Sequence, residues 1–92
     1  MDPNRLTATE AARAIAAGRL APAALMEACL ARAAEREPAV RAFVHLDPAQ
    51  ARRSAARPGP LHGIPIGVKD VLDTADMPSE YGSPIWAGHR PR

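Results

Sequence analysis

The chain contains one lysine, one cysteine and three aromatic residues among its 92 residues. One cysteine cannot build a disulfide framework or a cysteine-based metal centre, and we expect neither a metal nor a cofactor. The formal net charge of +2 and the scarcity of aromatic rings argue against a nucleic-acid partner. No apolar run approaches the roughly 18 residues of a membrane span, and the first ten residues lack the pattern of a signal peptide. We therefore expect a cytoplasmic protein without a membrane partner.

The length fits one small domain or a piece of a larger one. Hydrophobic residues make up 47% of the chain, but many of them are alanines, which fill little volume. We therefore expect a limited core and low stability for this segment alone. Nothing in the sequence specifies an oligomeric state.

Local signals predict a helical hairpin over residues 1–38. Thr7 and Glu10 have the spacing of a capping box, and Gly18 is a plausible C-terminal stop. Ala21-Pro22 would open a second helix, because the N–H that proline lacks is not needed there. Pro38 is predicted to end this helix. One apolar face is expected to contain Leu25, Met26, Cys29, Leu30 and Ala33.

Two further segments are predicted after the hairpin. Residues 39–57 are expected to hold a short strand, "VRAFVHL", followed by a short helix that Asp47 caps. Residues 58–92 are expected to hold a buried strand, "IPIGVKDVLD", and a loop. Because Pro65 cannot donate to a sheet, this strand is predicted at an edge or a bulge.

Lys69, the single lysine, is the candidate catalytic residue. Arginine keeps its proton in proteins, whereas a lysine in an apolar setting can lose it and act as a general base. Ile66 and Val68 precede Lys69 and favour such a setting. The alternative is that Lys69 is an ordinary basic residue at a strand end, and residue chemistry alone leaves both interpretations open.

The stretch "GPLHGIPIGVKDVLDTADMPSEYGSPIWAGHRP", residues 59–91, resembles the N-terminal part of the amidase signature family. The matching positions are Gly59, Pro60, Leu61, Gly63, Ile64, Pro65, Val68, Lys69, Asp70, Asp73, Thr74, Gly82 and Ser83. Asp76 and Ser79 depart from residues common in the family, glycine and threonine respectively. The resemblance implies an α/β fold of which this chain holds the N-terminal helical hairpin and the first strands of the mixed sheet.

The resemblance also implies hydrolysis of a small-molecule carboxylic amide by a serine nucleophile, a bridging serine in a cis peptide and a lysine base. Lys69 matches the base. The serines of this chain, Ser54, Ser79 and Ser83, lack the glycine-rich surroundings of the family's two serines. We therefore expect residues 1–92 to be the truncated opening of a longer enzyme and to be inactive alone.

Two alternatives stay open. The A subunit of the glutamyl-tRNA amidotransferase shares the motif and works with partner subunits, although the loop around Asp76 is closer to stand-alone amidases. The chain could also be a non-enzymatic helical interaction remnant, which would fold cooperatively and bind a partner.

Overall fold

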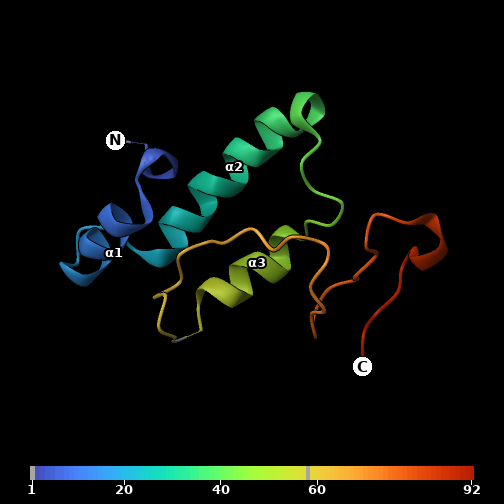
Figure 1. Ribbon diagram of the computed structural model, residues 1–92. Helices are drawn as coiled ribbons and strands as arrows, with labels where there is room; N and C mark the ends of the chain where they lie inside the picture. The colour runs from blue at the N-terminus through green and yellow to red at the C-terminus, as the bar shows by residue number, and fades with distance from the viewer. Residues whose placement is uncertain (1, 58) are drawn as a thin grey trace. The chain divides into compact units, whose positions relative to one another are not determined.

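A computed structural model describes residues 2–57 and 59–92 (Figure 1). Its elements are η1 (Pro3–Arg5), α1 (Ala8–Ala16), α2 (Pro22–Val40), α3 (Pro48–Ala55) and η2 (Pro84–Trp86). The chain divides into two compact units. The helical unit consists of the residues up to Ala42 together with Leu46–Pro65, and the lysine unit consists of Phe43–His45 and Ile66–Arg92. None of the helices described here has the length and apolar character that a membrane span requires.

Helix α1 begins at the capping box that the sequence predicts. Thr7 N donates to Glu10 Oε2 at 2.8 Å, and Glu10 N donates to Thr7 Oγ1 at 3.1 Å. These two bonds satisfy backbone donors that the first helical turn leaves unpaired. Gly18 follows the helix with a φ of 75°, so the predicted stop is also confirmed.

Helix α2 begins at Pro22 as predicted, but it does not end at Pro38. It continues to Val40, and Arg41 terminates it in the left-handed conformation with a φ of 52°. Glu37 supports this last turn, because its carbonyl oxygen accepts from Arg41 N at 2.8 Å and its Oε1 accepts from Ala42 N at 2.7 Å. A proline near a helix end removes one backbone bond, and the contacts of Glu37 allow the chain to complete the turn.

The predicted strands are absent from the residues that the structure describes. Residue 40 closes α2, and residues 42–47 have no regular structure. Residues 64–69, which lead up to and include Lys69, also have no regular structure and are not paired with another strand. Residues 70 and 71 form a turn. A strand is stabilised by hydrogen bonds to a neighbouring strand, and no described segment supplies one. The described residues thus show the helical part of the predicted α/β fold, and its strand part stays a prediction.

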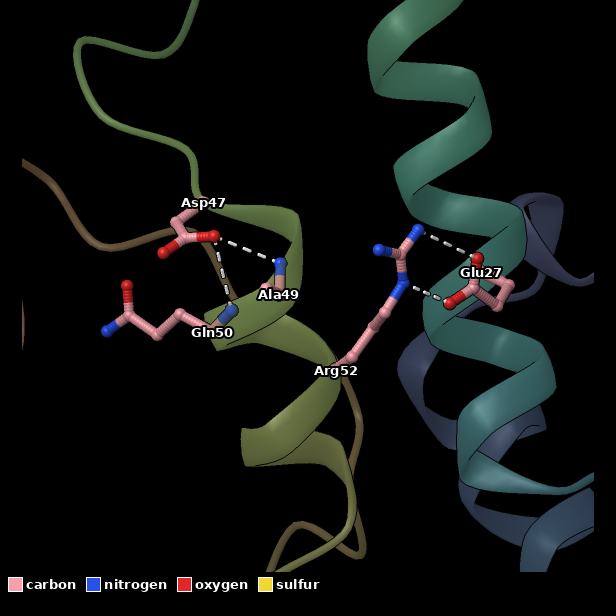
Figure 2. A network of polar contacts seen from close by, with 5 residues as sticks. All are labelled: Glu27, Asp47, Ala49, Gln50 and Arg52. Carbon is pink, nitrogen blue, oxygen red and sulfur yellow. Dashed lines mark hydrogen bonds and ion pairs between the residues drawn. The ribbon is translucent and has the colours of Figure 1, made fainter.

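The predicted helix after residue 47 is confirmed as α3. Asp47 Oδ1 accepts from Ala49 N at 3.0 Å and from Gln50 N at 3.3 Å, and Pro48 occupies the first helical position (Figure 2). The helix is joined to α2 by an ion pair between Arg52 and Glu27. Arg52 Nε and Glu27 Oε1 are 2.5 Å apart, and a second bond to Oε2 makes the contact bidentate (Figure 2).

The core of the helical unit is small. Ala11, Ala14, Leu20 and Leu25 form its buried cluster, and half-buried side chains surround them: Leu6, Ile15, Cys29 and Ile64. The predicted apolar face of α2 is confirmed, because all five of its residues are buried or half-buried. Two of the four central side chains are alanines, so little apolar area is buried.

The lysine unit contains almost no buried side chain. Among its described residues only Ser79 is buried, with 1% of its surface exposed. Its large apolar side chains face solvent: Phe43, Val44, Ile66, Val68, Val71, Leu72, Ile85 and Trp86. Hydrogen bonds, rather than an apolar core, therefore hold this unit together.

Candidate active site around Lys69

The residues that lead into the lysine stretch fit tightly into the helical unit. Gly63 has a φ of 82°, and a β-carbon there would lie 2.8 Å from Pro22 Cβ and 2.9 Å from the carbonyl oxygen of Ala55. Only glycine combines this conformation with this closeness. The next residue, Ile64, packs against the alanine core. The Gly-Ile pair of the motif therefore has a packing role.

Lys69 lies at the start of a tight turn. Its carbonyl oxygen accepts from Val71 N at 2.8 Å and from Leu72 N at 3.2 Å. The residue is exposed, and its ammonium group forms no ion pair within the described residues. The turn thus presents a single lysine whose ammonium group is not paired with any carboxylate that the structure describes.

The residues after Lys69 hold the loop by hydrogen bonds between side chains and the backbone. Asp70 Oδ1 accepts from Glu80 N at 2.9 Å, and Thr74 Oγ1 donates to the carbonyl oxygen of Met77 at 3.1 Å. Asp70 Oδ2 is buried and has no hydrogen-bond partner among the described residues. Asp70 therefore contacts the loop, and its carboxylate is not paired with the neighbouring lysine.

Asp73 contacts a side chain of the same unit: its carboxylate accepts a hydrogen bond from the Tyr81 hydroxyl. This bond raises the pKa of the Tyr81 phenol, and partial burial and the negative charges of Asp73 and Asp70 add to the rise. Tyr81 also begins an aromatic cluster. Its ring centroid lies 5.7 Å from that of Trp86, which lies 4.9 Å from that of His89.

His89 is half-buried against Trp86. Its carbonyl oxygen also accepts from Ser79 N at 2.7 Å. Within the described ranges, no three His, Cys, Asp or Glu side chains are grouped closely enough to hold a metal ion.

The three serines do not complete a catalytic group with Lys69. Ser79 is buried and its Oγ donates to the carbonyl oxygen of Leu72 at 3.2 Å. Ser83 caps η2, and its Oγ accepts from Ile85 N at 3.3 Å. Ser54 lies on the exposed side of α3. No hydrogen bond joins a serine to Lys69 in the part of the chain that the structure describes.

Sequence reasoning missed the roles of Ser79 and Glu80. Ser79 reaches back seven residues to Leu72, and Glu80 reaches back ten residues to Asp70. No pattern of neighbouring residues announces contacts of this range. The only local signal is that two polar residues, Ser79 and Glu80, lie next to each other between Pro78 and Tyr81.

The motif around Lys69 and the sequence on both sides of it match known proteins. The family model for amidases matches residues 24–92, three quarters of the chain. The chain belongs to the amidase family. The resemblance seen in residues 59–91 is thereby confirmed, and the family match extends back into α2.

Curated relatives of this amidase-family chain are named as the A subunit of glutamyl-tRNA(Gln) amidotransferase. The protein of Chloroflexus aurantiacus is 47% identical over 98 residues, which cover 96% of this chain and 20% of that protein. The proteins of Salinispora arenicola and Cereibacter sphaeroides are 40% and 41% identical, over 98% and 99% of this chain and 20% of each relative. The chain thus spans about a fifth of the length of these relatives. No solved structure matches it.

Proposed function

We propose that this chain supplies Lys69 as the general base of an amide-hydrolysing site. The observation that carries the proposal is the position of the only lysine: it lies inside the family match and on an exposed turn, and its ammonium group is unpaired within the described residues. An amide is the substrate class because the chain belongs to the amidase family.

In the proposed reaction Lys69 starts as a neutral amine and accepts a proton from a bridging serine. That serine accepts the proton of a second serine, whose oxygen attacks the amide carbonyl. Collapse of the tetrahedral intermediate breaks the C–N bond, and the proton held by Lys69 returns to the departing nitrogen. Water then cleaves the acyl-enzyme by the same proton route and releases the carboxylic acid.

The two serines of this reaction are proposed to lie outside residues 1–92. Ser79 is buried and Ser83 caps a helix, so neither hydroxyl of the lysine unit is placed to attack a substrate. A neutral lysine also requires a dry environment, and Lys69 is exposed here. The exposed apolar side chains Ile66, Val68 and Val71 offer a surface that further protein would cover. We therefore expect the 92 residues alone to hydrolyse no amide.

A chimera tests this proposal. All 92 residues would replace the matching segment of the Chloroflexus aurantiacus relative, and release of ammonia from small carboxylic amides and from glutamine would be measured. Lys69→Met should lower kcat by about 10²–10⁴-fold, the usual contribution of a general base. Arg90→Met, which removes a charge from the same unit, should leave kcat within about threefold. Equal activity of the Lys69→Met chimera and its parent would contradict the proposal.

The second candidate is a component of an amidotransferase complex, which we consider because relatives at 40–47% identity are named as subunits of one. In that case ammonia released from glutamine would be passed to a tRNA-bound acceptor with the help of partner subunits. The same chimera discriminates between the two candidates. Glutamine hydrolysis that depends on the other subunits of the relative's complex supports the amidotransferase component. Rapid hydrolysis of simple amides without those subunits supports a stand-alone amidase. The cytoplasmic location and the lack of a cofactor stay predictions from the sequence.

A further inference from the structure

Two consecutive residues connect the turn of Lys69 to the C-terminal segment of the lysine unit. Ser79 Oγ donates to the carbonyl oxygen of Leu72 at 3.2 Å, and Glu80 N donates to Asp70 Oδ1 at 2.9 Å. In the other direction Ser79 N donates to the carbonyl oxygen of His89 at 2.7 Å. Gly88 N donates to Glu80 Oε2 at 2.6 Å. We call these four contacts the Ser79–Glu80 bridge.

The bridge lies in a unit that has almost no buried apolar side chain. Ser79 is its single buried side chain among the described residues, and the apolar side chains on the Lys69 turn are exposed: 57% of Val71 and 58% of Leu72. Packing therefore does not fix residues 69–72. A buried hydroxyl that loses its acceptor incurs a desolvation cost, so the bond from Ser79 to Leu72 favours one position of the turn.

The bonds reach the turn on both sides of its centre. Asp70 directly follows Lys69, and Leu72 donates its own N–H to the carbonyl oxygen of Lys69. When the bridge fixes Asp70 and Leu72, it also fixes the backbone of Lys69, which is bonded to the first and hydrogen-bonded to the second. The position from which the Lys69 side chain extends is then defined. Thr74 Oγ1 lies 3.5 Å from Ser79 Oγ and adds a further polar neighbour to the buried hydroxyl.

We propose that Ser79 is a positioning residue for Lys69, acting with Glu80 through Leu72 and Asp70. This inference rests on the proposed function for the role of Lys69, but the bridge itself can be measured without it. The hydroxyl of Ser79 donates the bond that fixes the turn, so threonine at position 79 should preserve the positioning of Lys69 and alanine should not.

Amide hydrogen exchange of the 92-residue chain tests the bridge. Ser79→Ala should speed exchange at Val71 N, Leu72 N and Glu80 N by about tenfold, the usual effect of losing one buried hydrogen bond. Asp70→Ala should speed exchange at Glu80 N by a similar factor. Ser79→Thr should stay within about threefold of the parent because it keeps the donor. Ser54→Ala makes the same chemical change on the exposed side of α3 and should leave these amides unaffected. Absence of protection in the parent, or unchanged exchange in Ser79→Ala, overturns the proposal.

Kinetics in the chimera then test the positioning of the lysine. With rates referred to folded protein, Ser79→Ala should lower kcat about tenfold at unchanged KM, and Ser79→Thr should restore it. A change in KM alone, or failure of threonine to rescue, overturns the positioning role. If Lys69→Met leaves the chimera active, the proposed function fails while the exchange result still decides whether the bridge exists. If Lys69→Met abolishes activity and Ser79→Ala keeps full kcat, the function stands and the positioning role is overturned.

Discussion

Gly63 lies so close to Pro22, the first residue of α2, that a β-carbon at position 63 would approach the proline Cβ to 2.8 Å. The same β-carbon would lie 2.9 Å from the carbonyl oxygen of Ala55, the last residue of α3. A glycine of the amidase motif is thus a packing residue of the helical unit, and the same motif contains Lys69, the proposed base.

Gly63→Ala should destabilise the helical unit by at least about 2 kcal/mol, because a left-handed backbone costs a non-glycine residue about 1–2 kcal/mol and the clash adds about 1–3 kcal/mol. Gly18→Ala is the matched control, since Gly18 has a φ of 75° but a β-carbon placed there would meet nothing within 4 Å. It should show the backbone cost alone.

Cys29, the single thiol, provides the readout for this pair of variants. It is half-buried against the alanine core, and burial raises the pKa of its thiol, so it should react slowly with a disulfide reagent at neutral pH. Gly63→Ala should speed this reaction more than Gly18→Ala does. Equal rates in the two variants would show that the close approach to Pro22 has no energetic consequence.

The ion pair between Glu27 and Arg52 should give the helical unit a salt- and acid-sensitive contact. The hydrogen bond from Arg52 lowers the pKa of Glu27 from its ordinary value, and the charge of Arg52 adds to the decrease while desolvation opposes it. Its stabilisation is therefore fully present above the unfolded value and is lost as the pH falls through the lower folded pKa.

Glu27→Gln should reduce the thermal midpoint slightly at neutral pH and low salt, and the difference from the parent should vanish at low pH. It should also shrink in 1 M salt, where the Debye length is about 3 Å. Glu35→Gln breaks the pair with Arg32 within α2 and controls for the loss of one surface charge. A difference that persists at low pH would contradict the assigned contact.

Tyr81 is the only tyrosine, so its ionisation can be followed by ultraviolet absorbance. Its hydrogen bond to Asp73 raises the phenol pKa above 10.0, and Asp73→Asn should bring it back toward that value. Asp76→Asn removes a charge from the same loop and should change the titration less. Because the folded pKa is raised, the stability of the lysine unit should fall as the pH rises from the unfolded value through the folded one. A Tyr81 titration that Asp73→Asn leaves unchanged would show that this bond does not form in solution.

The features that sequence reasoning predicted correctly are those whose partners lie within a few residues. The capping box of Thr7 and Glu10, the proline at the start of α2 and the Asp47 cap each depend on one turn of helix. Periodicity likewise placed Leu25 and Met26 on the buried face of α2. These signals are local, so they can be read without knowing what the chain packs against.

Two predictions differ from the structure, the first because of a local contact and the second because of a missing distant partner. Val40 joins a helix because Glu37 completes its last turn, although the alternating pattern that begins there predicts a strand. The stretch before Lys69 has strand-like composition, but a strand forms only beside a partner, and the described chain supplies none. The motif gave the family and the candidate lysine, whereas the Ser79–Glu80 bridge became visible only in three dimensions.

The central claim is that Lys69 acts as a neutral amine that accepts a proton, and Lys69→Arg in the chimera tests it most directly. Arginine preserves the positive charge and much of the side-chain length but cannot serve as a base. We predict that kcat of the Lys69→Arg chimera falls by about 10²–10⁴-fold, as far as in Lys69→Met. If Lys69→Arg instead retains most of the parental kcat while Lys69→Met loses it, Lys69 acts as a fixed positive charge and the general-base account is wrong.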